Sequence, residues 1–93
     1  MLKIKIPMGY VVYKATCLET LMLGGAGICD ECNTPAAIGY LVPVLNRYMC
    51  PHCFKDWSNR AEYYPEDIPV EERVCKYYEA NIPLTEEGGE YRD

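Results

Sequence analysis

Residues 29–53 have the sequence CDECNTPAAIGYLVPVLNRYMCPHC, in which Cys29 pairs with Cys32 and Cys50 pairs with Cys53. Two residues separate the cysteines of each pair, and 17 residues separate the pairs. This spacing is typical of a zinc site, because two thiolates from one tight turn can bind the same ion and a second pair completes the tetrahedron. The sequence therefore predicts one structural Zn²⁺ ion with these four cysteines as ligands.

The length of the chain explains why a metal is expected to stabilise it. With 93 residues, the chain is one small domain, and domains of this size are often marginally stable without a metal or disulfides. We expect a single zinc-stabilised domain over residues 1–84, with the zinc module at 29–62. Residues 85–93 are acidic and contain glycine, which predicts a disordered tail.

Six cysteines in a small chain are also compatible with disulfides, which are typical of secreted proteins. However, Leu2–Ile6 alternates apolar and basic residues and then meets Pro7, so it lacks the apolar region of a signal peptide. No apolar run approaches the length of a membrane span. We therefore expect a cytoplasmic protein with reduced thiols and no membrane contact. Cys17 and Cys75, which lack a paired spacing, are expected to be small buried residues.

The second cysteine pair has a competing interpretation. Cys50, Pro51, His52 and Cys53 resemble the Cys-Pro-His-Cys active site of disulfide oxidases of the thioredoxin class, where a helix N-terminus lowers the pKa of a thiol. That interpretation leaves the first cysteine pair without a role. His52, the single histidine, is expected to point to solvent or to donate to a neighbour. An iron tetrathiolate, which uses the same four ligands, remains an alternative to zinc.

The residues around the cysteines predict the type of zinc fold. The stretch 38–44 is strand-like, Asn46 and Arg47 predict a turn, and the chain returns through Tyr48, which together indicate a hairpin between the two cysteine pairs. Beyond Cys53, apolar residues recur at helical spacing, with Phe54 and Trp57 on the buried side. A cysteine turn, a hairpin and a helix bearing the second pair make a treble-clef-like module; a zinc ribbon is the alternative.

The flanking segments complete an α+β domain. Leu2–Ile6 and Met8–Ala15 predict two N-terminal strands, and Thr16–Leu23 predicts a short helix or the end of a strand. A second helix is expected over Val70–Ala80, with Val70, Val74 and either Tyr77 or Tyr78 on its buried side.

Charge and tyrosine content indicate the kind of partner. The net charge is −5, and residues 56–93 alone carry four basic and eleven acidic side chains. Such a surface repels phosphate, so direct binding of nucleic acid is not expected unless Lys3, Lys5, Lys14 and Arg47 cluster.

An acidic surface can instead contact a basic patch of another protein. Candidate contact residues are the tyrosine pairs 63–64 and 77–78, in each of which we expect one ring to be buried and one exposed. Glu71 and Glu72 represent the acidic face, which is either such a contact or a solvated surface. The sequence does not predict an oligomeric state.

The zinc module also resembles a known group of proteins. Cys29-Asp-Glu-Cys32, followed by Gly39–Val44 and Tyr48–Trp57, resembles the zinc module of small proteins encoded by phages and prophages of Gram-positive bacteria. Within that group, the chain is most similar to zinc-bearing type II-A anti-CRISPR inhibitors. The resemblance implies binding to an RNA-guided nuclease in the host bacterial cytoplasm, and a block of target DNA loading or cleavage. It assigns no binding residue, because the matching motif holds only the metal ligands.

The sequence contains no constellation typical of an enzyme, since one histidine and a closed metal shell offer no nucleophile and base. We therefore expect a zinc-stabilised protein-binding inhibitor without catalytic residues. The alternatives are a zinc module that binds nucleic acid, which predicts steep salt dependence, and a Cys-x-x-Cys thiol oxidoreductase, which predicts turnover.

Overall fold

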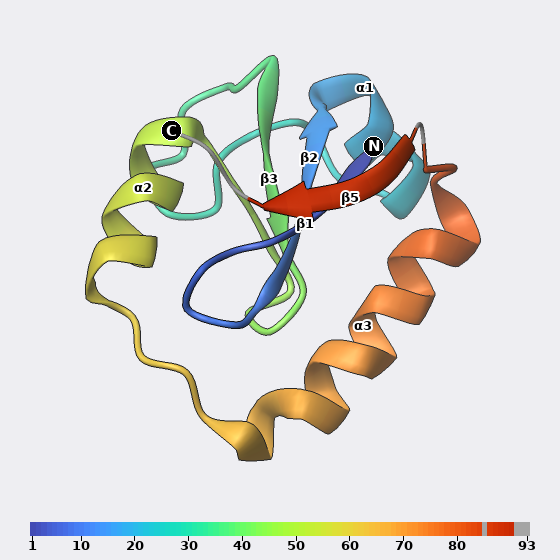
Figure 1. Cartoon of the computed structure of the whole chain (residues 1–93). Coiled ribbons are helices and arrows are strands. Elements are labelled where there is room, and N and C mark those ends of the chain that lie inside the picture. The colour runs from blue at the N-terminus through green and yellow to red at the C-terminus, as the bar shows by residue number, and fades with distance from the viewer. Residues whose placement is uncertain (85, 91–93) are drawn as a thin grey trace.

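A five-stranded sheet separates two helices, which cover its opposite faces (Figure 1). The computed structural model describes residues 1–84 and 86–90. The strands are β1 (Leu2–Lys5), β2 (Val11–Thr16), β3 (Ile38–Val42), β4 (Arg47–Met49) and β5 (Glu86–Glu90). The helices are α1 (Cys17–Thr20), the 3₁₀ turn η1 (Leu21–Leu23), α2 (Pro51–Arg60), the 3₁₀ turn η2 (Pro65–Asp67) and α3 (Ile68–Asn81). The prediction of an α+β fold with N-terminal strands and a C-terminal helix is confirmed.

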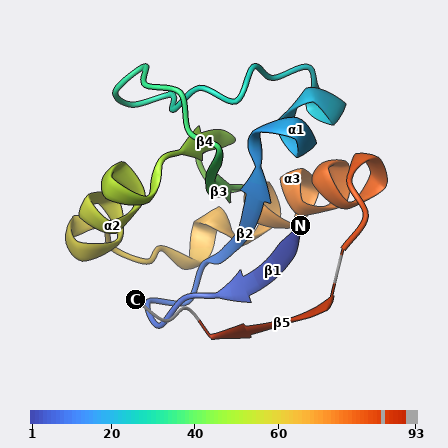
Figure 2. The same cartoon turned by 90° about the horizontal axis from the view of Figure 1, so that it is seen from above.

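The sheet has the order β4-β3-β2-β1-β5, and the first four of these strands pair antiparallel. Helix α2 and helix α3 lie on either side of it when the molecule is seen from above (Figure 2). Because alternate side chains of a strand point to opposite faces, each central strand contributes to two cores. In β2, Val12 packs on the α2 side, whereas Tyr13 and Ala15 pack on the α3 side.

The hairpin between the cysteine pairs forms as predicted, with Leu41 of β3 opposite Tyr48 of β4. Asn46 adopts a left-handed conformation in the turn, with a φ of 52°, which asparagine tolerates better than most residues. Gly39 allows the Tyr48 ring to cross β3, because a Cβ at that position would lie 2.8 Å from the ring. The Tyr48 hydroxyl then donates to the carbonyl of Ala36, at 2.8 Å.

Helix α2 forms as predicted, and Phe54 and Trp57 are buried against the sheet. Helix α3 begins at Ile68, two residues before the predicted start. Its buried face agrees with the prediction at Tyr78, which is buried, and at Val74, which is partly buried against the core, but Val70 is exposed and Glu71 is buried in its place.

The burial of the unpaired cysteines and of the two tyrosine pairs agrees with the predictions only in part. Cys75 is buried as predicted, but Cys17 is only half-buried. The 77–78 tyrosine pair has one buried ring, that of Tyr78, and one exposed ring, whereas Tyr63 and Tyr64 are both exposed. Tyr63 nevertheless packs one side of its ring against Tyr10, with ring centroids 4.8 Å apart.

The C-terminal segment differs from the predicted disordered tail over residues 86–90. These residues form β5, which pairs parallel with β1 and extends the sheet by one strand. Such pairing occupies backbone groups of β1 that would otherwise remain open at a sheet edge. The remaining positions of the predicted tail, 85 and 91–93, lie outside the described residues.

Glu71 is a structural residue of this fold rather than an exposed contact. Its side chain accepts a hydrogen bond from the backbone N–H of Val11 at 2.9 Å, and the residue is only 9% exposed. Strand β3 ends at Val42, and its pairing with β2 does not extend to Val11. The Glu71 carboxylate therefore accepts the hydrogen bond of the Val11 N–H in place of a partner strand. Burial raises the pKa of Glu71, because the ionised form loses its hydration. Glu71 is therefore not part of an exposed acidic face, whether that face is a contact or merely solvated.

We predict that Glu71→Ala lowers the free energy of unfolding by about 1–3 kcal/mol, because it leaves a buried N–H without an acceptor. Glu71→Gln keeps an acceptor and removes the buried charge. Since the folded-state pKa is raised, the stability contributed by Glu71 is present at acid pH and is lost as pH rises through that pKa. The stability of Glu71→Gln relative to wild type should therefore increase between about pH 4 and pH 7.

Chemical denaturation across this pH range measures the effect. The matched control is Glu72→Gln, because Glu72 is the exposed neighbour on the same helix. Parallel pH profiles for Glu71→Gln and Glu72→Gln would contradict the structural role of Glu71.

Candidate metal centre

The first cysteine pair lies in a tight turn before the hairpin. The N–H of Cys29 donates to the carbonyl of Thr34, and the N–H of Asn33 donates to the carbonyl of Cys29, both at 2.9 Å. Asn33 has a φ of 59°, a left-handed conformation that reverses the chain immediately after Cys32. This turn brings Cys29 and Cys32 to the same side of the loop.

The second pair lies where β4 runs into α2. Cys50 is the N-cap residue of α2, and its Sγ accepts a hydrogen bond from the N–H of Cys53 at 3.4 Å. Pro51 occupies the first turn, where its missing N–H costs no helical hydrogen bond. The helix start therefore holds both sulfurs of this pair on one side, one at the cap and one in the first turn.

Two reciprocal hydrogen bonds attach the first turn to the hairpin. The N–H of Asp30 donates to the carbonyl of Tyr48, and the N–H of Tyr48 donates to Oδ2 of Asp30, both at 2.8 Å. Glu31 forms an ion pair with Arg47 beside them. These contacts fix the turn of the first cysteine pair to Tyr48, which lies two residues before Cys50. The sequence analysis does not predict the role of Asp30, because no periodicity connects this residue with Tyr48. Its position between Cys29 and Cys32 is the signal that could have indicated it.

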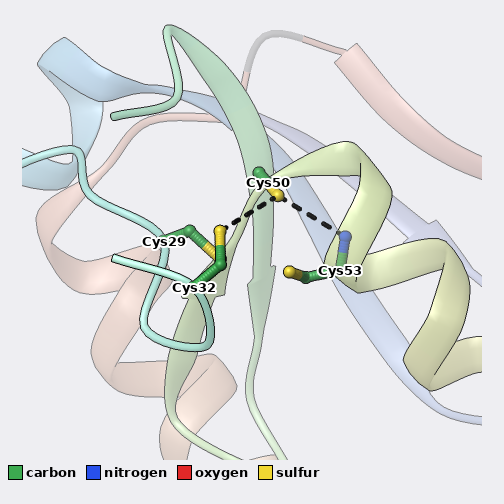
Figure 3. A group of neighbouring side chains, drawn as sticks. All are labelled: Cys29, Cys32, Cys50 and Cys53. Atoms are coloured by element: carbon green, nitrogen blue, oxygen red, sulfur yellow. Dashed lines mark hydrogen bonds between the residues drawn. The ribbon is translucent and has the colours of Figure 1, made fainter. Parts of the chain in front are cut away.

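The four sulfurs converge on one point (Figure 3). All four Sγ atoms lie within 4.8 Å of one another, and Cys32 Sγ is 3.9 Å from Cys50 Sγ. Four thiolates around a metal at about 2.3 Å would be separated by about 3.8 Å, the edge of the corresponding tetrahedron. A disulfide requires about 2.05 Å, and all four thiols are free. The spacing therefore fits a tetrahedral four-thiolate metal site.

The site continues the core on the α2 side of the sheet. Cys29 is fully buried in the core under α2, Cys50 and Cys53 are half-buried against that core, and Cys32 is exposed. Among the residues that the structure describes, these four cysteines are the group whose ligand atoms lie close enough to share a metal. His52 is exposed and lies outside the group, in agreement with the prediction.

The protonation of the thiols depends on their neighbours. Hydrogen bonds from the hydroxyl and the N–H of Thr34 lower the pKa of Cys32 to about 6. In contrast, the hydrogen bond with Cys50 and the loss of hydration raise the pKa of Cys53. Four negative charges within one small volume repel each other, so a bound cation is needed before all four thiols can ionise. Metal binding at this site should therefore release protons.

The arrangement supports a structural rather than a catalytic metal. The cysteines fill all four positions of a tetrahedral shell, so the geometry provides no site for a water or a substrate. The second pair also belongs to the start of a helix that packs on the sheet, as in a treble-clef module. A zinc ribbon would place that pair in a hairpin instead.

Comparison with protein-family models, with curated proteins and with solved structures finds no match to this chain. No helix in residues 1–84 or 86–90 combines the length and apolar character required to cross a membrane.

We predict that Cys32→Ser and Cys53→Ser each abolish stoichiometric metal binding, because a hydroxyl is a poor fourth ligand for a thiolate site. Native mass spectrometry of protein purified without added metal measures the stoichiometry. The matched control is Cys17→Ser, since Cys17 is half-buried and lies outside the cluster. Retention of one metal ion by Cys53→Ser, or its loss from Cys17→Ser, would contradict the assignment of ligands.

Proposed function

We propose that this chain is a zinc-stabilised protein-binding inhibitor with no catalytic activity of its own. The observation that carries the proposal is the cluster of four free thiols within 4.8 Å, at the junction of the hairpin and α2. A metal at this point stabilises the folded state, because the unfolded chain has no preformed site. Zinc is the ion proposed, since a tetrahedral four-cysteine shell without an open position is typical of structural zinc.

The exposed apolar side chains support protein binding. Leu18, Leu21 and Met22, on α1 and η1, are 71%, 57% and 54% exposed. Tyr77 of α3 is half-exposed, and together with Leu23 of η1 it lines one pocket of about 210 Å³. Large apolar side chains grouped on one segment are typical of an interaction surface. We infer that this surface, defined here by Leu18, Leu21, Met22 and Tyr77, contacts a partner protein.

The partner proposed is a type II RNA-guided nuclease, and the protein itself is then a phage anti-CRISPR inhibitor of the host cytoplasm. Support for this partner comes from the resemblance of the 29–57 stretch to such inhibitors. The charge is compatible with it, because the chain has a net charge of −5 and such nucleases hold nucleic acid in a positively charged channel. An acidic inhibitor that occupies this channel would exclude DNA.

The distribution of basic residues argues against nucleic acid as the partner. Lys3 is paired with Glu79, and Arg47 is paired with Glu31. Lys3 and Lys5 lie on β1 and Lys14 lies on β2, whereas Arg47 lies on β4, which β2 and β3 separate from β1 in the sheet order. The cluster that binding to phosphate requires is therefore not formed by these residues. The oxidoreductase alternative is also weakened, because Cys50 and Cys53 share their site with two further thiols.

Elemental analysis and a DNA-cleavage assay test the proposal together. We expect one zinc per chain, and loss of target DNA cleavage when the zinc-loaded protein is incubated with a type II nuclease before DNA is added. If the elemental analysis finds iron in place of zinc, iron is the metal of the site. Unchanged cleavage and no complex at large molar excess, across nucleases from several Gram-positive hosts, would reject the inhibitor function.

A paired substitution locates the contact surface. We predict that Leu18→Glu with Leu21→Glu weakens inhibition at least tenfold, because two apolar side chains that the partner would cover become charged. The control is Ile68→Glu with Val70→Glu, which places the same two charges on exposed apolar positions of α3. Equal loss of inhibition in both variants, at equal zinc content, would contradict the proposed surface.

A further inference from the structure

We propose that a pocket beside the linker from α2 to α3 binds the guanidinium group of an arginine side chain from a partner protein. The inference rests on the proposed function, because it gives the chemistry of the partner surface. The pocket lies between three segments that are distant in sequence: Tyr10 before β2, the β3–β4 turn, and the stretch from the C-terminal end of α2 through the linker (yellow in Figure 1) to η2.

The pocket is small and aromatic. Its volume is about 260 Å³, which is below the range of about 300–1,000 Å³ that is usual for small-molecule sites. Tyr10 and Trp57 line it with stacked rings, whose centroids are 6.1 Å apart, and Val44 and Leu45 add apolar surface. Tyr64 lines the pocket while 47% exposed, so part of this residue is accessible to a ligand. A single side chain fits this volume better than a larger ligand does.

Two carboxylates lie in the same lining. Asp67 accepts a hydrogen bond from the hydroxyl of Tyr10 at 2.6 Å, and Glu62 accepts one from the hydroxyl of Tyr64 at 2.8 Å. Each carboxylate has two oxygens and about four acceptor positions, so one bond to a tyrosine leaves capacity for a second donor. The tyrosines therefore position the carboxylates at the pocket and leave them able to accept from a cation.

The protonation states of these groups favour a cationic ligand. Burial and the hydrogen bond to Asp67 raise the pKa of Tyr10 to about 12. The hydrogen bond to Glu62 raises the pKa of Tyr64. Both phenols thus remain neutral donors at physiological pH. The Tyr10 ring is buried against Trp57 and Tyr63, so the half-exposed ring of Tyr64 is the one whose electron-rich face can attract a cation.

The chain itself places one guanidinium at this pocket. Arg60 lines it, and its Nε donates to Oδ2 of Asp56 at 3.3 Å on the exposed surface of α2. The Nε of Arg60 is thus bound to Asp56 of the same helix, and the positive charge of Arg60 lies at the pocket. An arginine from a partner would then compete with the positive charge of Arg60.

Guanidinium fits the pocket better than ammonium does. A planar guanidinium stacks on an aromatic ring and presents several N–H donors in one plane, so it can use a ring and a carboxylate together. The ammonium of lysine is a compact, strongly hydrated charge that loses more hydration in an aromatic site. We therefore expect the pocket to select arginine over lysine.

The single tryptophan of the chain provides the assay, because Trp57 lines the pocket. The zinc-loaded protein is titrated with N-acetyl-arginine amide while tryptophan fluorescence and the NMR signal of the indole N–H are followed. N-acetyl-citrulline amide is the matched probe, since it has nearly the same shape without the charge, and N-acetyl-lysine amide tests selectivity. We expect saturation by the arginine probe in the millimolar range and at least fivefold weaker binding of the other two.

Three variants separate binding from a structural role. Asp67→Asn should weaken the arginine probe about tenfold while an acceptor for Tyr10 is kept. Tyr64→Leu should weaken it about threefold, and Tyr77→Leu, at an equally exposed tyrosine outside the pocket, should not. Arg60→Gln should strengthen binding, because it removes the competing charge. A purely structural pocket would not bind more tightly after that change.

The outcomes are distinct for the pocket and for the proposed function. Equal responses to the arginine and citrulline probes, or unchanged binding in Asp67→Asn, would overturn the pocket assignment. If the arginine probe does not bind while the protein still inhibits the nuclease, the inhibitor function is supported and its contact lies elsewhere on the surface. If the arginine probe binds but no complex with the nuclease forms, the pocket assignment is supported and a type II nuclease is rejected as the partner.

Discussion

The structure depends on the convergence of two cysteine pairs on one point. Cys29 and Cys32 come from a loop, and Cys50 and Cys53 come from the start of α2, so a shared metal ties a loop, a hairpin and a helix together. The reciprocal hydrogen bonds between Asp30 and Tyr48 hold the two halves in register without the metal. The metal then compensates the charge of four thiolates, which protein groups alone could not stabilise at this distance.

A two-faced sheet explains why a chain of this size needs such a site. The buried residues divide into two clusters, one under α2 and one under α3, so neither core is large. Cys29 belongs to the α2-side core, and Cys50 packs against both cores, so the metal site lies where the two meet the end of the hairpin. Stabilisation at that position acts on both layers of the domain.

The fold was predictable from sequence where a local pattern carried it. The cysteine spacing gave the ligand set, and the apolar spacing of Phe54 and Trp57 gave α2, because both depend on residues near in sequence. The buried face of α3 was not predictable in the same way. Glu71 is buried because β3 stops short of Val11, a fact of the tertiary structure, and Val70 is then displaced to the surface. The pairing of β5 with β1 and the role of Asp30 likewise depend on distant partners.

The surface features follow from this arrangement. Helix α2 ends beside the hairpin turn, so Trp57 and the linker residues Glu62 and Tyr64 meet there and form an aromatic, acidic pocket. All of these features depend on the four-thiolate metal site, which X-ray absorption at the zinc edge of the purified chain can examine. We predict a first shell of four sulfurs at about 2.3 Å. A shell containing nitrogen or oxygen, or a chain without metal in which these cysteines form disulfides, would contradict it.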